Sequence, residues 1–280
     1  FRVDHVLGFF RIWSIPAHAV EGVMGRFVPA IPVDVATFSE RGIAFDYSRF
    51  CEPYITDAVL YELLGENRNL VKDFLELRQD GSYALKPSFS TQRKAAAYFS
   101  SLEINEENIL LQSALYDLIS NVILFEEEGS QQQQFHFRID IENTISFRHL
   151  DGYTQHQLKV LYVDYFFHRQ EELWATQAMY KLPALKKSTN MLVCGEDLGM
   201  VPRCVPEIMR QLGILSLEIQ RMPKQAGAAF FNPANAPRLS VVTPSTHDMS
   251  TIRAWWEENR EETQHFFNDE MQHPGLAPYY

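Results

Sequence analysis

Three apolar segments, each ending at an acidic residue, constrain the fold of this chain more than any other feature of its sequence. They read FRVDHVLGFF at 1–10, MLVCGEDLGM at 191–200 and LSVVTPSTHDM at 239–249. Apolar, β-branched runs of this kind are typical of buried parallel strands. The strand carboxyl ends of a parallel α/β barrel open onto a single face, so acids distant in sequence can meet there. Converging carboxylates are the groups that cleave and form glycosidic bonds.

Composition and charge limit the possible classes of protein. Of the 280 residues, 46% are hydrophobic and 13% aromatic, which is ample for a large core. The formal net charge of −11 argues against a nucleic-acid partner, because proteins that bind nucleic acids present a basic surface. The sequence contains no run of about 18 apolar residues, so we expect no membrane span.

The cysteines and the first residue indicate the setting of the chain. Cys51, Cys194 and Cys204 form neither a C-x-x-C pair nor a disulfide-dense pattern. Such sparse cysteine usage is typical of a reducing compartment, so the expected location is the cytoplasm. The chain starts at Phe1, inside an expected strand and without an initiator methionine. We therefore expect it to be a piece of a longer protein.

Alternating strands and helices are predicted around the three acidic segments. The expected strands cover four apolar runs, at 1–4, 191–195, 214–220 and 239–243. Between the second and third, apolar residues at helical spacing predict a helix over 202–212, ended by Gly213. A further helix should follow Asp248, with Ser250 as its N-cap. This alternation is typical of βαβ units in a parallel sheet.

The spacing of the acids predicts a large insertion after the first strand. Glu196 and Asp248 are 52 positions apart, which is room for two βα units, whereas Asp4 and Glu196 are 192 apart. Because one crossover needs only about 30–40 residues, roughly 120–150 residues must be additional. We interpret the insertion as structural cover or as a partner surface rather than as a set of direct substrate contacts.

The inserted sequence has patterns of its own. A broad apolar stripe predicts a helix over 105–128, and 135–139 could pair with 145–150 as a short hairpin. A long helix over 154–187 should return the chain to the barrel, with a break at Pro183.

The acidic segments and their neighbours resemble a known family. RVDH followed by GF and WSIPA, then GEDLG, then THD, occur in the order found in glycoside hydrolase family 77, the 4-α-glucanotransferases (amylomaltases or disproportionating enzymes). The strings LGFFRIW, EIQRMP and RAWWEE at 7–13, 218–223 and 253–258 are similar to the plant-type cytosolic branch of that family. The similarity is strong over about 1–55 and 160–260 and thin between these stretches.

The resemblance implies a fold and a division of the chain. The four strands would be strands four to seven of a (β/α)8 TIM barrel interrupted by a large, mostly helical insertion. Residues 1–50 would hold barrel strand four and the following substrate loop, and 51–160 the mostly helical insertion. Residues 161–280 would hold barrel helix four through strand seven and its helix.

The resemblance also implies an activity. A 4-α-glucanotransferase moves glucosyl or α-1,4-glucan units from maltose or maltodextrin to a glucan or glucose acceptor by a retaining double displacement. Asp4 would be the nucleophile, Glu196 the general acid/base and Asp248 the third carboxylate that binds sugar hydroxyls. No cofactor is implied, and the oligomeric state stays open. The alternative is a non-catalytic glycan-binding or scaffold protein that keeps the fold without turnover.

Four further residues are expected to contact substrate. Arg2 shares a strand face with Asp4 and would support its charge, although a purely structural ion pair is the competing interpretation. His5 and His247 would bind sugar, while His247 could instead be a buried structural histidine. Trp13 could stack on a glucose ring or simply fill the core. His247 next to Asp248 could ligate a metal, but no further ligand motif supports this, so we expect no metal site.

Two details of the motifs bear on the roles. Because neighbouring residues of a strand point to opposite sides, only Glu196 of the Glu196–Asp197 pair should face the pocket. Asp197 is then expected to cap the following turn. Val6 and Leu7 stand where the family usually has an aromatic residue and arginine, and the stretch PAIP at 29–32 replaces an expected glycine-rich segment.

Overall fold

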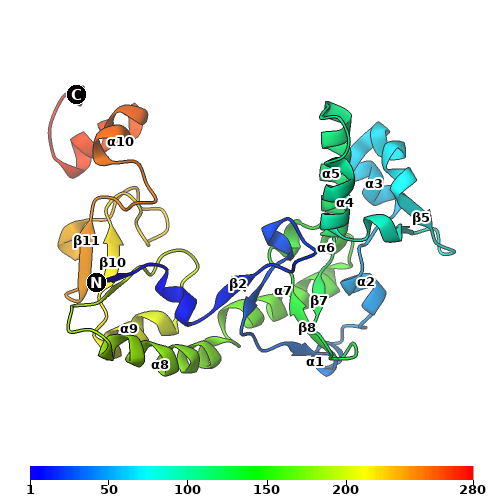
Figure 1. The fold of residues 1–280 in the computed structure, drawn as a ribbon, viewed down its shortest axis with the longest axis horizontal. Coiled ribbons are helices and arrows are strands. Elements are labelled where there is room, and N and C mark those ends of the chain that lie inside the picture. Colours follow the sequence, from blue (N-terminus) through cyan, green and yellow to red (C-terminus); the bar gives the residue numbers. More distant parts are fainter. Residues whose placement is uncertain (280) are drawn as a thin grey trace. The chain divides into compact units, whose positions relative to one another are not determined.

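The chain folds into two compact units of mixed helix and sheet (Figure 1). The computed structural model describes residues 1–279. One unit, here called the parallel-strand unit, combines Phe1–Arg11 with the chain from Glu171 onward, and the insertion unit is Ile12–Gln170. The observed divisions thus fall after residues 11 and 170. The predicted division at 50 and 160 rests on the family resemblance and stays a prediction.

Four short parallel strands form the centre of the parallel-strand unit. They are β1 (Arg2–Val3), β9 (Cys194–Gly195), β10 (Ser216–Ile219) and β11 (Ser240–Thr243). β1 pairs with β9 and β10 with β11, and a parallel bridge from Cys194 to Leu215 joins the two pairs. The order is therefore β1–β9–β10–β11, and each predicted strand is present in shortened form. Within residues 1–279 these strands do not close into a barrel.

Helices connect and follow these strands. They are η1 (Val6–Phe9), α8 (Glu171–Lys187), α9 (Cys204–Leu212), η6 (Pro233–Asn235), α10 (Ile252–Glu258), α11 (Arg260–His265) and the π-helical turn Phe266–Glu270. The predicted helix over 202–212 is confirmed as α9, which ends at Gly213 in the left-handed conformation with φ of 60°. The N-cap of α10 is Thr251 rather than Ser250, because the Thr251 hydroxyl accepts the Ala254 N–H while Ser250 donates to Glu258.

Antiparallel strands characterise the insertion unit. β2 (Ile12–Ser14) pairs with β3 (Arg26–Val28), and β5 (Leu75–Leu77) pairs with β6 (Tyr83–Leu85). The third sheet has the order β4 (Val33–Asp34), β8 (Gln134–Phe137), β7 (Leu124–Glu126). The helices of this unit are α1 (Val35–Glu40), α2 (Tyr47–Cys51), α3 (Asp57–Leu64), α4 (Gln92–Phe99), α5 (Glu106–Ile119), α6 (Ile145–Arg148) and α7 (Gly152–Phe167). The unit also contains four 3₁₀ helices, which are η2 (Gly22–Met24), η3 (Gly65–Phe74), η4 (Pro87–Phe89) and η5 (Ile141–Asn143).

The predicted hairpin of 135–139 with 145–150 is wrong. β8 pairs instead with β7 and β4, and 145–148 is helix α6. Thr144 caps α6 by accepting the Phe147 N–H, so a local hydrogen bond favours a helix over an extended strand. The helix predicted over 105–128 stops at Ile119, because Asn121 bonds to Tyr54 and Ser146 and the chain then enters β7.

The predicted break at Pro183 is also misplaced. Pro183 lies inside α8, and the chain breaks at 168–170, between α7 and α8. The Gln170 amide accepts from the Ile31 N–H at 2.6 Å and donates to the Ile31 carbonyl at 3.0 Å. Arg169 donates to the Pro32 carbonyl at 2.9 Å. These contacts with a distant segment stabilise a non-helical turn that the helical periodicity does not indicate.

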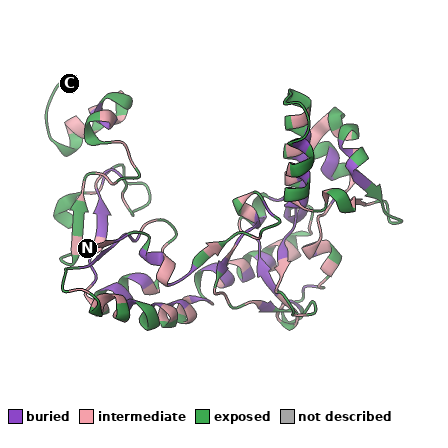
Figure 2. Cartoon of the chain, viewed as in Figure 1, coloured by how far each residue is buried: buried purple, intermediate pink, exposed green. Residues whose placement is uncertain are grey.

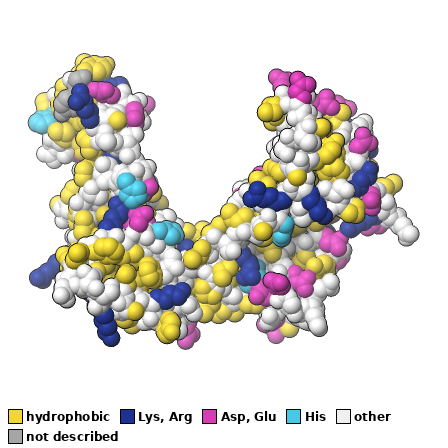
Figure 3. All heavy atoms as spheres, viewed as in Figure 1, with side chains coloured by type: hydrophobic (Ala, Val, Ile, Leu, Met, Phe, Trp, Pro, Cys, Tyr) yellow, Lys and Arg dark blue, Asp and Glu magenta, His cyan; other side chains and the backbone are white. Residues whose placement is uncertain are grey.

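Each unit buries its own apolar side chains (Figure 2). In the insertion unit, Phe38, Phe135 and Phe137 are fully buried, and a second cluster forms around Val59, Leu115 and neighbouring residues. Acidic and basic side chains are interspersed on the face shown in Figure 3. None of the described helices has the length and apolarity that crossing a bilayer requires.

Candidate active site

The turn after β1 carries Asp4 and is tied to Glu196 at the end of β9. The Glu196 N–H donates to the Val3 carbonyl, and the Val6 N–H donates to the Glu196 carbonyl, both at 2.9 Å. The His5 N–H donates to Glu196 Oε2, also at 2.9 Å. These three hydrogen bonds reach the residues on both sides of Asp4. Asp4 and Glu196, 192 positions apart in the sequence, are therefore held in one local framework.

His5 closes this turn in an uncommon backbone conformation. Its φ is 50°, in the left-handed region that non-glycine residues rarely adopt. The hydrogen bond from its N–H to Glu196 offsets part of the cost of that conformation. The His5 side chain is 65% exposed, with Nδ1 at 3.9 Å from Glu196 Oε2. The ring thus stays accessible beside the acid.

Glu196 and Asp197 point to different surroundings, as strand alternation predicts. Glu196 is buried, and its Oε1 accepts the Leu198 N–H at 2.8 Å. Asp197 is buried toward β10, where its Oδ1 accepts the Leu217 N–H at 3.0 Å. The expectation that Asp197 caps the following turn is wrong, because the turn N–H of Leu198 is taken by Glu196. Asp197 instead joins two strands.

Asp4, His247 and Asp248 form an exposed polar group at the strand ends. Arg2 lies 2.8 Å from Asp4, which confirms the predicted pairing along one strand face. His247 Nε2 lies 3.5 Å from Asp4 and 3.3 Å from Asp248. His247 is 58% exposed rather than buried as a structural histidine. A histidine between two carboxylates links the end of β1 to the loop after β11.

The same three residues are the one potential cation-binding group found within 1–279. One ligand atom from each of Asp4, His247 and Asp248 lies within 4.8 Å of the others, and all three residues are exposed. Carboxylate and imidazole donors suit divalent metals. Arg2 already occupies one oxygen of Asp4, and exposed acids commonly gather without a metal. The expectation of no metal site stays a prediction.

Trp13 belongs to the insertion unit. It lies in β2, where its indole N–H donates to the Gly22 carbonyl at 2.9 Å and its ring meets Phe27 edge-on with centroids 4.7 Å apart. A Cβ on Gly25 would lie 2.4 Å from the indole nitrogen, so glycine is required there. Trp13 is partly buried, and its stacking on a sugar stays a prediction.

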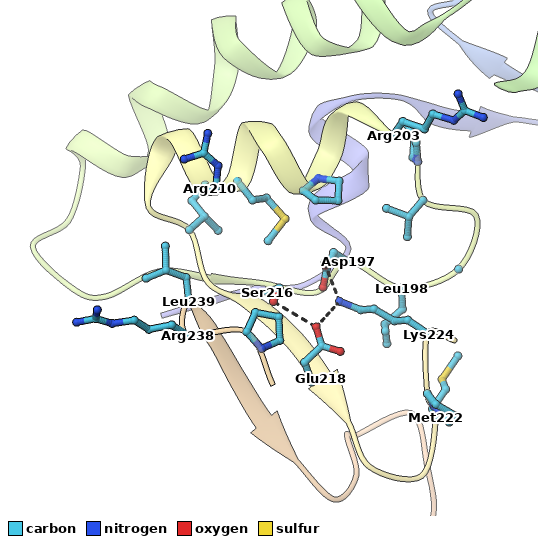
Figure 4. Close-up of a pocket in the computed structure, with 18 residues that line it drawn as sticks. Asp197, Leu198, Arg203, Arg210, Ser216, Glu218, Met222, Lys224, Arg238 and Leu239 are labelled. Carbon is cyan, nitrogen blue, oxygen red and sulfur yellow. Dashed lines mark hydrogen bonds and ion pairs between the residues drawn. The ribbon is translucent and has the colours of Figure 1, made fainter. Parts of the chain in front are cut away.

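The sequence analysis missed a charge cluster beside Asp197, in which the exposed Lys224 reaches two buried acids (Figure 4). Lys224 Nζ lies 2.8 Å from Asp197 Oδ2 and 3.0 Å from Glu218 Oε1. Burial raises the pKa of the Asp197 carboxyl, and the hydrogen bonds from Lys224 and from the Leu217 N–H oppose that rise. The cluster borders a cavity of about 930 Å³ with largely apolar walls. The one available signal was Glu218, a charge inside an apolar strand.

Arg11 was also missed as a structural link. It is buried, donates to the Met200 carbonyl and lies over the Trp174 ring, 5.1 Å from its centroid. Burial lowers the pKa of Arg11 to about 10. Arg11 thereby connects the segment after η1 to the loop that follows Glu196 and to α8. Glu171, at the start of α8, accepts the N–H groups of Arg203 and Cys204 at the start of α9.

Comparison with known proteins defines the family. The family model described as 4-alpha-glucanotransferase, Glyco_hydro_77, matches residues 1–279, and the chain belongs to this family. The 4-alpha-glucanotransferase DPE2 of Oryza sativa subsp. japonica is 37% identical over 273 residues, covering 95% of this chain and 28% of that protein. The 4-alpha-glucanotransferases of Chlamydia pneumoniae and Chlamydia caviae are 34% and 36% identical over 87 residues, or 30% of this chain and 16% of each relative.

The extent of these matches is part of the finding. The chain spans only 28% of the length of the rice relative, although almost all of it is matched. No solved structure matches the chain.

Proposed function

We propose that this chain carries the catalytic groups of a retaining 4-α-glucanotransferase. It would transfer glucosyl or α-1,4-glucan units from maltose or maltodextrin to a glucan or glucose acceptor. The observation that best supports this is the junction of Asp4 and Glu196, where three hydrogen bonds bind Glu196 to the residues flanking Asp4. His247 adds Asp248 to the same group. Membership of the 4-alpha-glucanotransferase family supports the same activity.

Each carboxylate has a distinct role in this proposal. The Asp4 carboxylate attacks the anomeric carbon, the bond to the leaving oxygen breaks, and Glu196 gives that oxygen its proton. In the second half-reaction, Glu196 takes the proton from an acceptor 4-hydroxyl, whose oxygen displaces Asp4 from the anomeric carbon. The configuration is thus inverted twice and retained overall. Arg2 donates to the Asp4 carboxylate at 2.8 Å.

The remaining site residues would bind the sugar. Asp248 and His247 are exposed next to Asp4, so their polar atoms are available for hydroxyl groups of the ring that reacts. His5 presents an exposed imidazole beside Glu196. Trp13 would supply an aromatic face for a glucose unit. These four assignments come from the motif positions and are proposals.

The fold and setting complete the proposal. The parallel order β1–β9–β10–β11 supports assigning these strands as four to seven of a (β/α)8 barrel, interrupted by the insertion. On this assignment, 1–50, 51–160 and 161–280 are the three sections of the barrel and its insertion. Cys51, Cys194 and Cys204 are free thiols, which supports a reducing location such as the cytoplasm.

One assay tests the activity directly. The full-length protein is incubated with maltose or maltodextrin, and chain lengths and reducing ends are measured together. Redistributed chain lengths with little net increase in reducing ends are the expected result. A net increase in reducing ends would show that the enzyme is a hydrolase rather than a transferase. Glucan binding without turnover would support the non-catalytic alternative. Asp4→Asn, which removes the nucleophile, is the matched negative control.

A further inference from the structure

We propose that Lys224 is a positioning residue for Glu196, and that it acts by holding the Asp197 side chain in its hydrogen bond to β10. This inference rests on the proposed function only in naming Glu196 as the group that is positioned. Lys224 does not contact Glu196. It reaches the end of β9 through Asp197, the next residue in the chain.

Lys224 neutralises two buried acids at once. Its ammonium lies 2.8 Å from Asp197 and 3.0 Å from Glu218, whose side chains are only 5% and 8% exposed. Ser216 adds a hydroxyl 3.3 Å from Glu218 (Figure 4). A cation between two desolvated carboxylates avoids the large cost of a buried charge that has no counterion.

Asp197 Oδ1 accepts a β10 backbone N–H that a carbonyl of β9 would otherwise accept. β9 and β10 are joined by backbone hydrogen bonds at Leu215, where Gly195 N–H donates to the Leu215 carbonyl and Leu215 N–H to the Val193 carbonyl. Leu217 is the next residue of β10 whose N–H points toward β9, and this N–H donates to Asp197 Oδ1 rather than to a backbone carbonyl. The Asp197 side chain therefore determines where the chain leaves the β9 ladder, directly after Glu196.

A shift at this point is transmitted to Glu196. The Glu196 backbone is bonded to Val3 and Val6, and its carboxylate to His5 and Leu198. All of these bonds require the β9 end to hold its position against the Asp4 turn. Displacements of about 1 Å in a reacting group can reduce turnover by about 100-fold. Backbone bonds to the Asp4 turn hold Glu196 on one side, and the Asp197–Lys224 ion pair holds the residue that follows it.

The test uses the full-length protein and begins with Lys224→Met. We expect kcat to fall by about 10–100-fold with KM changed less than about threefold, because a misplaced acid slows the chemical step without removing a sugar contact. Lys224→Arg keeps the positive charge and should retain most of the activity. The matched control is Arg210→Met, which removes a cation that lines the same cavity but pairs with Glu207, and it should keep kcat within about twofold.

A double variant distinguishes positioning from other roles of Lys224. In Asp197→Asn with Lys224→Met, the neutral amide oxygen still accepts the Leu217 N–H and needs no cation, so kcat should recover about tenfold over Lys224→Met alone. Glu218→Gln with Lys224→Met leaves Asp197 without its cation and should stay as slow as Lys224→Met. Equal activity of the two double variants, or no loss in Lys224→Met, would overturn the proposal. A rise in KM alone would overturn it too, because it would indicate a substrate contact.

Hydrogen exchange supplies a readout that does not depend on activity. Lys224→Met should speed exchange of the Leu217 amide about tenfold or more, and the double variant with Asp197→Asn should slow it again. Unchanged exchange in Lys224→Met would overturn the anchor. If the wild-type protein transferred no glucan, the proposed function would fail, while the exchange result would still decide whether Lys224 holds Asp197 on β10.

Discussion

One polar group in each unit of the molecule shows two opposite uses of charged side chains. In the parallel-strand unit, Asp4, His247 and Asp248 are 58%, 58% and 69% exposed at the strand ends. In the insertion unit, His136 in β8 is 0% exposed and pairs with Glu127 and Arg26. The first group has polar atoms available to a ligand, whereas the ring nitrogens of His136 are already paired inside the fold. Exposure, rather than the presence of charge, therefore separates these two groups, while the buried Glu196 shows that burial alone does not remove a residue from the site.

The buried group of the insertion unit shows what internal use means. The two ring nitrogens of His136 lie 2.7 Å from the Tyr165 hydroxyl and 2.7 Å from Glu127. Arg26 lies 2.9 Å from Glu127 and 3.1 Å from the same ring. Burial of this kind is tolerated only when the polar groups are paired, and the pairing joins β3, β8 and α7. The network thereby links three elements of the insertion unit through one buried imidazole.

The largest expected effect is that of Asp4→Asn. The amide cannot form the glycosyl ester, so transfer should fall by at least about 10⁴-fold, while the thermal midpoint stays near that of the wild type because Asp4 is exposed. Asp80→Asn, at an exposed acid of the insertion unit, should leave transfer unchanged. Transfer assays and calorimetry on both variants check this. A fully active Asp4→Asn protein would show that the exposed strand-end group does not hold the nucleophile.

Glu196→Gln should have the next largest effect. Turnover should fall by about 10²–10⁴-fold, since the amide keeps the shape of the site but cannot shuttle a proton. Activated donors whose leaving group needs no protonation should recover part of the first step. Steady-state kinetics with maltodextrin and with an activated glucoside measure both. If Asp197→Asn were more damaging than an active Glu196→Gln, the roles of the two acids would have to be exchanged.

A core substitution tests the scaffold side of the comparison. Phe135 is fully buried, with its ring 4.7 Å from that of Phe45, so Phe135→Ala should lower the free energy of unfolding by about 3–5 kcal/mol. Ile104→Ala is the control, because Ile104 is 88% exposed and should cost less than about 0.5 kcal/mol. Urea unfolding monitored by fluorescence measures both. Equal effects would show that the aromatic cluster is not the core of this unit.

The insertion unit should lose stability in acid through His136. Burial lowers the pKa of His136, Arg26 lowers it further, and Glu127 raises it less. Because the folded pKa lies below the unfolded value of about 6.5, the unfolded chain binds the proton more readily, and stability falls as pH drops through about 6.5. The contribution is at most about 1.4 kcal/mol per pH unit. Urea titrations from pH 7.5 to 5.5 should show a flatter slope for His136→Gln, and an identical slope would assign the acid sensitivity to other groups.

The smallest expected effect is that of metal removal. Asp4, His247 and Asp248 could gather around a cation, yet all three are exposed and Arg2 pairs with Asp4. Dialysis against EDTA should therefore leave transfer activity within experimental error. Loss of activity that one divalent ion restores would identify a metal site and change the role of Asp248.

The four parallel strands and the end of α9 were predictable because their signals are local. The apolar runs at β1, β9, β10 and β11 and the stop of α9 at Gly213 depend on residues within a few positions. The placement of the acids at strand ends also predicted that Asp4 and Asp248 would approach each other, and both lie near His247. Glu196 and Asp197 have different hydrogen-bond partners, as alternation along extended backbone predicts, while the role of Glu196 stays a prediction.

What the tertiary structure alone decided depends on partners far away in the chain. The break between α7 and α8 follows from the pairing of Gln170 with Ile31, which is 139 positions away. Asp197 became a link between strands rather than a turn cap because Leu217 and Lys224, 20 and 27 positions on, offer it hydrogen bonds. A periodic pattern records which face of an element is buried, whereas it carries no record of which distant polar group will satisfy a buried donor. The sequence by itself therefore determined the acids and their strands, and tertiary hydrogen bonding determined how those acids are held.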